Sequence, residues 1–152
     1  MSEQVARELL RELGTRIQLP MLDLDDAGNA CIDVDEAYVI NLEYDADEDA
    51  LLMYTWLGHV PESNTAEVLR RLLSANHFWT ETEGATLSVE EETNGIVLID
   101  RSRCQDFDIA SFESRMQGYM SVVERWLKIL DGSEEEPELR EDVAPPHGFL
   151  RA

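Results

Sequence analysis

Residues 38–57 read YVINLEYDADEDALLMYTWL, and this stretch decides the fold. From Tyr38 to Tyr44, every second side chain is large and apolar or aromatic, which is typical of a strand with one buried face. The acidic residues 45–49 predict a turn. Residues 51–57 are apolar on both faces, which indicates either a central strand covered on both sides or a strand with one face at a subunit interface.

The segments on either side add helices and further strands. Apolar residues recur at helical spacing before Pro20, which cannot continue a helix. Asn64 and Glu67 have the spacing of a capping box and predict the start of a second helix. The pair Asn94-Gly95 predicts a hairpin between two strands. The expected elements are a helix before residue 20, strands at 31–35, 38–44 and 51–57, a helix from 64 to 79, strands at 86–89 and 96–99, and a helix from about 106 to 130.

This order, α-β-β-β-α-β-β-α, predicts an α+β domain in which three helices pack on a twisted antiparallel sheet. We expect one domain over residues 1–131. From Asp131 onward, glutamates and prolines replace the periodic apolar residues. We therefore expect residues 132–152 to form an acidic, disordered tail.

The charge of the chain is extreme, with 33 acidic and 12 basic residues and a formal net charge of -21. Because 43% of the residues are apolar and recur periodically, this charge predicts an acidic surface around an ordinary core. Nucleic acids and anionic membranes are excluded as partners, because both require clustered lysine and arginine. A partner protein that is basic or exposes apolar surface fits better.

The sequence predicts a cytoplasmic protein without a cofactor. The N-terminal residues contain no apolar run of signal-peptide length, and no segment approaches the roughly 20 apolar residues that span a bilayer. Cys31 and Cys104 are far apart and are expected to be free thiols.

No group of residues has the spacing of a catalytic or metal site. His59, His77 and His147 fall in different predicted elements. Residues 23–28 begin like a calcium-binding loop, but Val34 stands where that loop needs a bidentate glutamate. We therefore expect no catalytic, cofactor-binding or metal-binding residues, and no enzyme activity.

Trp56, Trp79 and Trp126 each end or follow an apolar run. Tryptophan at such positions fills a core or anchors an interface, where it is enriched. Core packing is the favoured role, and the two-sided apolar strand 51–57 strengthens the interface alternative for at least one of them.

The chain resembles the class I type III secretion chaperones, the CesT/SycE-like or Tir chaperone family. The resemblance covers roughly residues 5–130, and it depends on the joint order and spacing of several short segments. They are Leu9-Leu10 with Leu13-Gly14, Leu19-Pro20, residues 24–28 with Cys31-Ile32, residues 39–44, residues 51–54, residues 72–79, and residues 84–89 with 93–95.

The resemblance implies a cytoplasmic bacterial homodimer that binds the N-terminal segment of a secreted effector. The effector is then kept soluble and competent for secretion, and is passed to the secretion ATPase. The alternative on the same fold is a regulatory module that sequesters a secretion regulator. A small metabolic enzyme is a third hypothesis, without a supporting motif.

The resemblance also implies two surfaces. The second predicted helix is expected at the dimer interface, with Leu69, Leu72, Leu73, Phe78, Trp79 and Trp56. The effector is expected near Val5, Leu9, Leu13, Ile17, Leu19 and Val39. Core packing is the alternative role for these residues, and for Leu13 and Ile17 it is the favoured one.

Overall fold

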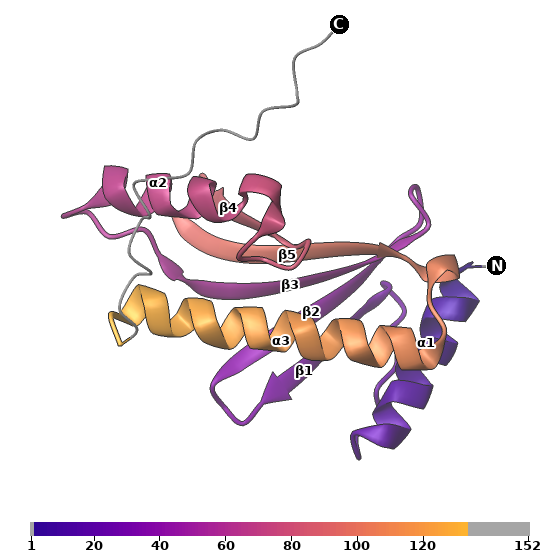
Figure 1. The fold of residues 1–152 in the computed structure, drawn as a ribbon. Coiled ribbons are helices and arrows are strands. Elements are labelled where there is room, and N and C mark those ends of the chain that lie inside the picture. Colours follow the sequence, from indigo (N-terminus) through magenta and orange to yellow (C-terminus); the bar gives the residue numbers. More distant parts are fainter. Residues whose placement is uncertain (1, 134–152) are drawn as a thin grey trace, which may run out of the picture.

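A computed structural model describes residues 2–133 of the chain. It contains three helices and a five-stranded antiparallel sheet, so the predicted α+β fold and element order are confirmed (Figure 1). The elements are α1 (Ser2–Arg16), β1 (Asn29–Val34), β2 (Tyr38–Asp45), β3 (Ala50–His59), α2 (Thr65–Ala75), η1 (His77–Trp79), β4 (Thr86–Glu90), β5 (Gly95–Arg103), η2 (Cys104–Asp106) and α3 (Ile109–Asp131).

The strands are arranged in the order β1-β2-β3-β5-β4, with β3 in the centre and β1 and β4 at the two edges. The first three strands form a meander, in which Ile32 lies opposite Ile40 and Leu42 lies opposite Met53. The chain then passes through α2 and returns as the β4–β5 hairpin, whose second strand pairs with β3. Because β5 takes the place beside β3, β4 is left at the far edge.

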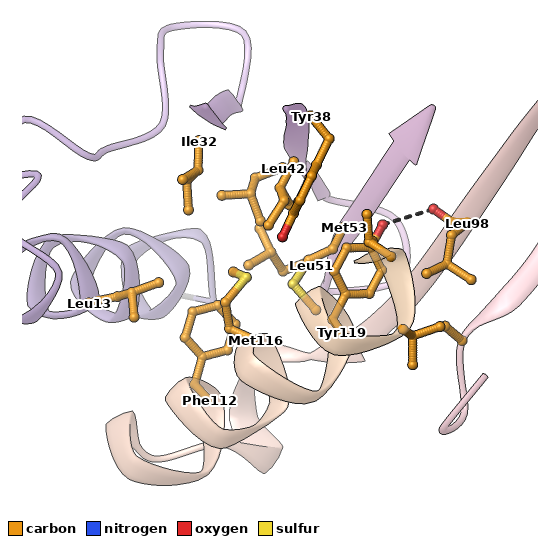
Figure 2. Packing of buried hydrophobic residues seen from close by; sticks show 14 of the residues in the cluster. Leu13, Ile32, Tyr38, Leu42, Leu51, Met53, Leu98, Phe112, Met116 and Tyr119 are labelled. Carbon is orange, nitrogen blue, oxygen red and sulfur yellow. Dashed lines mark hydrogen bonds between the residues drawn. The ribbon is translucent and has the colours of Figure 1, made fainter. Parts of the chain in front are cut away.

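Helix α3 runs across one face of the sheet, which we call the inner face (Figure 1). Phe112 and Met116 point into a cluster that also contains Leu42 and Met53 from the strands (Figure 2). The Tyr119 hydroxyl donates a hydrogen bond of 2.9 Å to the carbonyl oxygen of Leu98, which satisfies this polar group in the core. The inner face is therefore the hydrophobic core of the domain.

Local sequence signals fix the ends of α3. Asp108 accepts a hydrogen bond of 2.8 Å from the Ser111 amide, and the Ser111 hydroxyl completes a capping box. Gly132 adopts the left-handed conformation, with φ 78°, directly after the last helical residue, Asp131. The capping box predicted for α2 is wrong, because the Asn64 side chain makes no cap hydrogen bond.

The segment after α1 folds back onto the helix and brings residues 19–23 beside β1. The Leu19 amide donates a hydrogen bond of 2.7 Å to the Gly14 carbonyl oxygen. A Cβ atom at Gly14 would collide with the Leu19 carbonyl oxygen, so only glycine permits this approach. Asp23 is then held by Arg11, with N–O distances of 2.9 and 2.7 Å, and by Arg7 at 3.2 Å.

Within residues 2–133, no helix has both the length and the apolar character needed to cross a membrane. The predicted acidic tail falls almost entirely outside the described residues, so its disorder stays a prediction.

Candidate protein-binding site

The two edges of the sheet differ in which of their outward-facing backbone groups are already paired. At the β4 edge, Asn76 lies directly after α2 and binds the backbone of Leu87. Its side-chain amide donates to the Leu87 carbonyl oxygen at 2.9 Å, and its side-chain oxygen accepts from the Leu87 amide at 2.9 Å. This side chain occupies the position that the backbone of an additional strand would need.

At the β1 edge, the first residue is covered in a similar way, because the Asn29 amide donates to the Asp25 carboxylate at 2.9 Å and the Asn29 carbonyl oxygen accepts from the Asp25 amide at 2.7 Å. The rest of the strand differs. The Tyr44 amide donates to the Gly28 carbonyl oxygen at 2.9 Å, so even-numbered residues in this segment face β2. The backbone groups of Cys31 and Asp33 therefore point away from the sheet. No strand within residues 2–133 pairs with this side of β1. The edge can accept an extended segment from another chain.

Two hollows lie beside this open edge. One has a volume of about 300 Å³ and is lined by Leu19, Pro20, Met21, Leu22, Asp23, Ala30 and Cys31. The other has a volume of about 200 Å³ and lies between β1, α1 and α3; its apolar lining is Leu13, Ile17, Ile32, Val34, Ile40, Met116 and Met120. An added strand projects successive side chains to opposite faces, so hollows beside one edge strand can accept alternate residues.

The structure brings three of the six predicted effector-binding residues to these hollows. Leu13 and Ile17 line the smaller one, and Leu19 lines the larger one. Ile17 and Leu19 are 40% and 42% exposed, whereas Leu13 is buried and also belongs to the core. A partly exposed rim above a buried floor is a suitable geometry for an apolar side chain of a partner.

The other three residues lie elsewhere. Leu9 is buried in the core, and Val5 is partly exposed on α1. Val39 lies opposite Asp33 and is exposed on the face of the sheet that points away from the core, which we call the outer face. Their assignment to the effector site stays a prediction.

The predicted interface residues on and after α2 form an exposed surface. Leu73 is 72% exposed, and a shallow hollow of about 660 Å³ runs along Ala66, Leu69, Arg70, Leu73, Ser74 and His77. Phe78 and Trp79 follow directly and are also exposed. Leu72 is buried beneath this surface, while Trp56 lies on the outer face of the sheet.

Phe78 and Trp79 stand on a segment with unusual backbone angles. Both have positive φ values, 50° and 53°, which large side chains rarely adopt. The segment is held from beneath by Glu81. Its carboxylate accepts two hydrogen bonds from Arg71, at 2.9 and 2.6 Å, and its carbonyl oxygen accepts one from Trp126 Nε1 at 3.3 Å. Two exposed aromatic side chains on a fixed support are typical of interface anchors.

Sequence reasoning did not identify Asn76, Arg71 or Glu81. Their function depends on the backbone of β4 and on the position of Trp126, which are set by long-range packing. Trp126 itself is fully buried, with its ring 5.0 Å from the Arg71 guanidinium carbon.

The charged groups around the open edge are structural. The hydrogen bond from Arg11 holds the pKa of Asp23 below its ordinary value. Within residues 2–133, no group of histidine, cysteine, aspartate and glutamate side chains has the geometry of a metal site. What this region offers is backbone without a strand partner within residues 2–133, beside two apolar hollows, and together they suit an extended polypeptide.

Comparison with known proteins agrees with this geometry. The sequence profile of the Tir chaperone protein (CesT) family matches residues 8–127. The chain therefore belongs to the CesT family of Tir chaperones, and the predicted family membership is confirmed.

Individual relatives are distant in sequence but close in fold. The protein CPj0713/CpB0740 of Chlamydia pneumoniae is 26% identical over 109 residues, covering 72% of this chain and 82% of that protein. A chain in the crystal structure of the ExsC–ExsE complex is 25% identical with a TM-score of 0.72, covering 84% of this chain and 95% of that one. A chain in the HopA1–SchA chaperone–effector complex has a TM-score of 0.67 at 18% identity, covering 84% of this chain and 97% of that one.

Proposed function

We propose that this chain is a cytoplasmic bacterial chaperone of type III secretion. It binds the N-terminal segment of a secreted effector and keeps that protein soluble and competent for secretion. Membership of the CesT family supports the class of function. The observation that carries the proposal is the open β1 edge, with its two hollows beside Cys31 and Asp33.

Binding at this edge uses backbone and side chains together. An extended effector segment hydrogen-bonds to the outward-facing backbone of β1, which gives affinity without demanding a particular sequence. Its alternate apolar side chains enter the hollows near Leu19 and Ile17, which gives selectivity. The bound segment is held extended, so this segment does not fold while it is bound.

The proposal includes no chemical step. The chain supplies no cofactor and acts only by binding, as expected of a chaperone family. The strongly acidic surface supports this role. A protein that exposes apolar binding surfaces risks self-association, and a net charge of -21 per chain makes copies of the partner-free dimer repel one another.

We also propose that the working form is a homodimer, formed through the exposed surface of α2. Leu69, Leu73, Phe78 and Trp79 supply its apolar contacts, and the buried Leu72 supports the helix from beneath. Replacing Leu73 by glutamate should convert the dimer to a monomer in light scattering, because the carboxylate would be buried in the interface. Leu19→Glu is the matched control on another exposed leucine. A dimer that survives Leu73→Glu would contradict this surface.

The proposed function is tested by recovering the partner. The tagged full chain is purified from its native bacterium, bound proteins are identified by mass spectrometry, and the mass of the complex is measured. The proposal expects two copies of this chain per secreted protein, and loss of binding when the N-terminal segment of that protein is deleted. Recovery of a secretion regulator instead would establish the sequestering alternative. Recovery of neither would contradict both.

A further inference from the structure

The outer face of the sheet holds a further hollow, separate from those at the β1 edge and along α2. Its volume is about 430 Å³, and all of its lining residues belong to strands β2, β3, β4 and β5. The lining is Asn41, Tyr54, Trp56, Ser88, Val89, Glu90, Val97 and Ile99. The hollow thus combines two aromatic rings, an apolar floor and one carboxylate.

The Trp56 ring is held in a defined place. A Cβ atom at Gly95 would overlap the six-membered part of the Trp56 indole, so the ring lies directly over the backbone of this glycine. The indole also meets His59 in an edge-to-face contact, with ring centroids 5.2 Å apart. His59 Nδ1 in turn lies 3.2 Å from the Thr93 carbonyl oxygen. Trp56 nevertheless remains 41% exposed, which leaves part of the ring available to a ligand.

Glu90 lies on the other side of the same glycine. In the β4–β5 ladder, Glu90 is the direct partner of Gly95 and is exposed on the outer face. The Thr93 hydroxyl donates to one of its carboxylate oxygens. None of the ion pairs found within residues 2–133 involves Glu90. Its charge is therefore fixed beside the Trp56 ring without a cation to neutralise it.

We propose that this hollow binds a basic side chain, arginine or lysine, of the partner polypeptide. A cation placed between Trp56 and Glu90 is attracted by the face of an aromatic ring and by a carboxylate at once. The aliphatic stem of the same side chain packs on Val97 and Ile99. The net charge of -21 also draws a basic segment toward the surface and repels an acidic one.

This inference rests on the proposed function, since it takes the partner to be the effector segment. It adds the requirement that this segment carries an arginine or a lysine. A second copy of this chain is the competing occupant, because Trp56 is also a predicted interface residue. The two occupants differ in their dependence on positive charge.

The test uses nuclear magnetic resonance of the full chain, read at the indole N–H of Trp56. This signal is assigned by its loss in Trp56→Phe, which keeps a ring over Gly95. The probes are acetyl-Val-Arg-Val-amide and the same peptide with neutral citrulline in place of arginine, which has nearly the same shape. The expected result is a saturable shift with the arginine peptide and binding about tenfold weaker with the citrulline peptide.

Two variants test the carboxylate. Glu90→Gln should weaken the arginine peptide about tenfold while leaving the citrulline peptide unchanged. Glu92→Gln removes the same charge from the same hairpin, outside the hollow, and should leave both affinities unchanged. Equal affinity for the two peptides, or no shift of Trp56 with either, would overturn the inference. A Trp56 signal that changes only on dilution of the protein would assign the hollow to a second copy, which also overturns it.

Failure of the basic-side-chain site can be distinguished from failure of the proposed chaperone function. An effector recovered equally well by Glu90→Gln and by the parent chain refutes the basic-side-chain site and leaves the chaperone intact. Selective binding of the arginine peptide without recovery of any secreted protein supports the site and refutes the chaperone proposal.

Discussion

The β4 edge and the β1 edge of the same sheet differ in where their outward-facing backbone groups are covered. At β4, Asn76 satisfies both outward-facing backbone groups of Leu87. At β1, the outward-facing groups of Cys31 and Asp33 have no strand partner within residues 2–133. Unprotected edges invite aggregation, and folded proteins usually block them. The stretch of β1 from Cys31 to Asp33 is left open beside two apolar hollows, whereas Asn76 blocks β4 at Leu87, and this difference indicates that β1 offers a surface to a partner.

The largest expected effect is a difference in thiol reactivity between Cys31 on the β1 edge and Cys104 in the core. Cys31 is exposed on the open edge, whereas Cys104 is buried and its pKa is raised by burial to about 11. At pH 8 only about 0.1% of Cys104 is then a thiolate, which is the reactive form. Alkylation followed by mass spectrometry should therefore modify Cys31 at least about 100-fold faster than Cys104.

Bound effector segment should protect Cys31 from this reaction and leave the slow rate at Cys104 unchanged. Cys31→Ser supplies the control, because it should abolish the fast phase alone. If Cys31 reacts at the same rate in the complex as in the free chain, the partner does not cover this edge.

The second effect is on partner affinity. Cys31→Pro removes the backbone N–H that points away from the sheet, without removing a bond to β2. Proline is tolerated at such edge positions, so the free energy of unfolding should change little. The affinity for the effector segment should fall roughly 30-fold, corresponding to about 2 kcal/mol for a partner carbonyl left unpaired.

Cys31→Ser is again the matched control, because it changes the side chain and keeps the amide. Both variants are compared by calorimetric titration with the effector segment. Wild-type affinity in Cys31→Pro, with normal folding, would exclude strand addition at β1.

The smallest effect is on stability at the closed edge. Asn76→Ala should lower the free energy of unfolding in urea by roughly 1 to 2 kcal/mol, because two hydrogen bonds to Leu87 are lost. Asn64→Ala is the comparison, since the Asn64 side chain makes no cap hydrogen bond, and its effect should stay within a few tenths of a kcal/mol. Equal stabilities of the two variants would show that Asn76 is not what closes this edge.

The sequence was sufficient to predict the order of the helices and strands, but not which strands lie at the edges of the sheet. The alternation from Tyr38 to Tyr44 predicts β2 because a half-buried strand has a period of two, and its inner residues are indeed in the core. The two-sided apolar strand 51–57 is the centre of the sheet, with Met53 buried and Trp56 exposed. Which strand lies at an edge depends on the β3–β5 pairing, a long-range contact that leaves no local signal.

The candidate site was only partly predictable for a similar physical reason. Helical spacing places Leu9, Leu13 and Leu72 on apolar faces, but such a face is wide enough to include both buried residues and exposed neighbours such as Leu73. Which residues of such a face are buried and which stay exposed depends on what packs against the helix. The positive φ values at Phe78 and Trp79 likewise have no local sequence signal such as a glycine, and the segment that follows them is held by contacts of Glu81 with distant residues.

The most direct test of the account is amide hydrogen exchange at the two edges, with and without the effector segment. In the free chain, the amides of Cys31 and Asp33 should exchange quickly, while the Leu87 amide, bonded to Asn76, should exchange slowly. Addition of the segment should protect Cys31 and Asp33 and leave Leu87 unchanged. A bound segment that leaves the exchange of Cys31 and Asp33 unaltered would contradict the proposal that the open β1 edge is where this chaperone holds its partner.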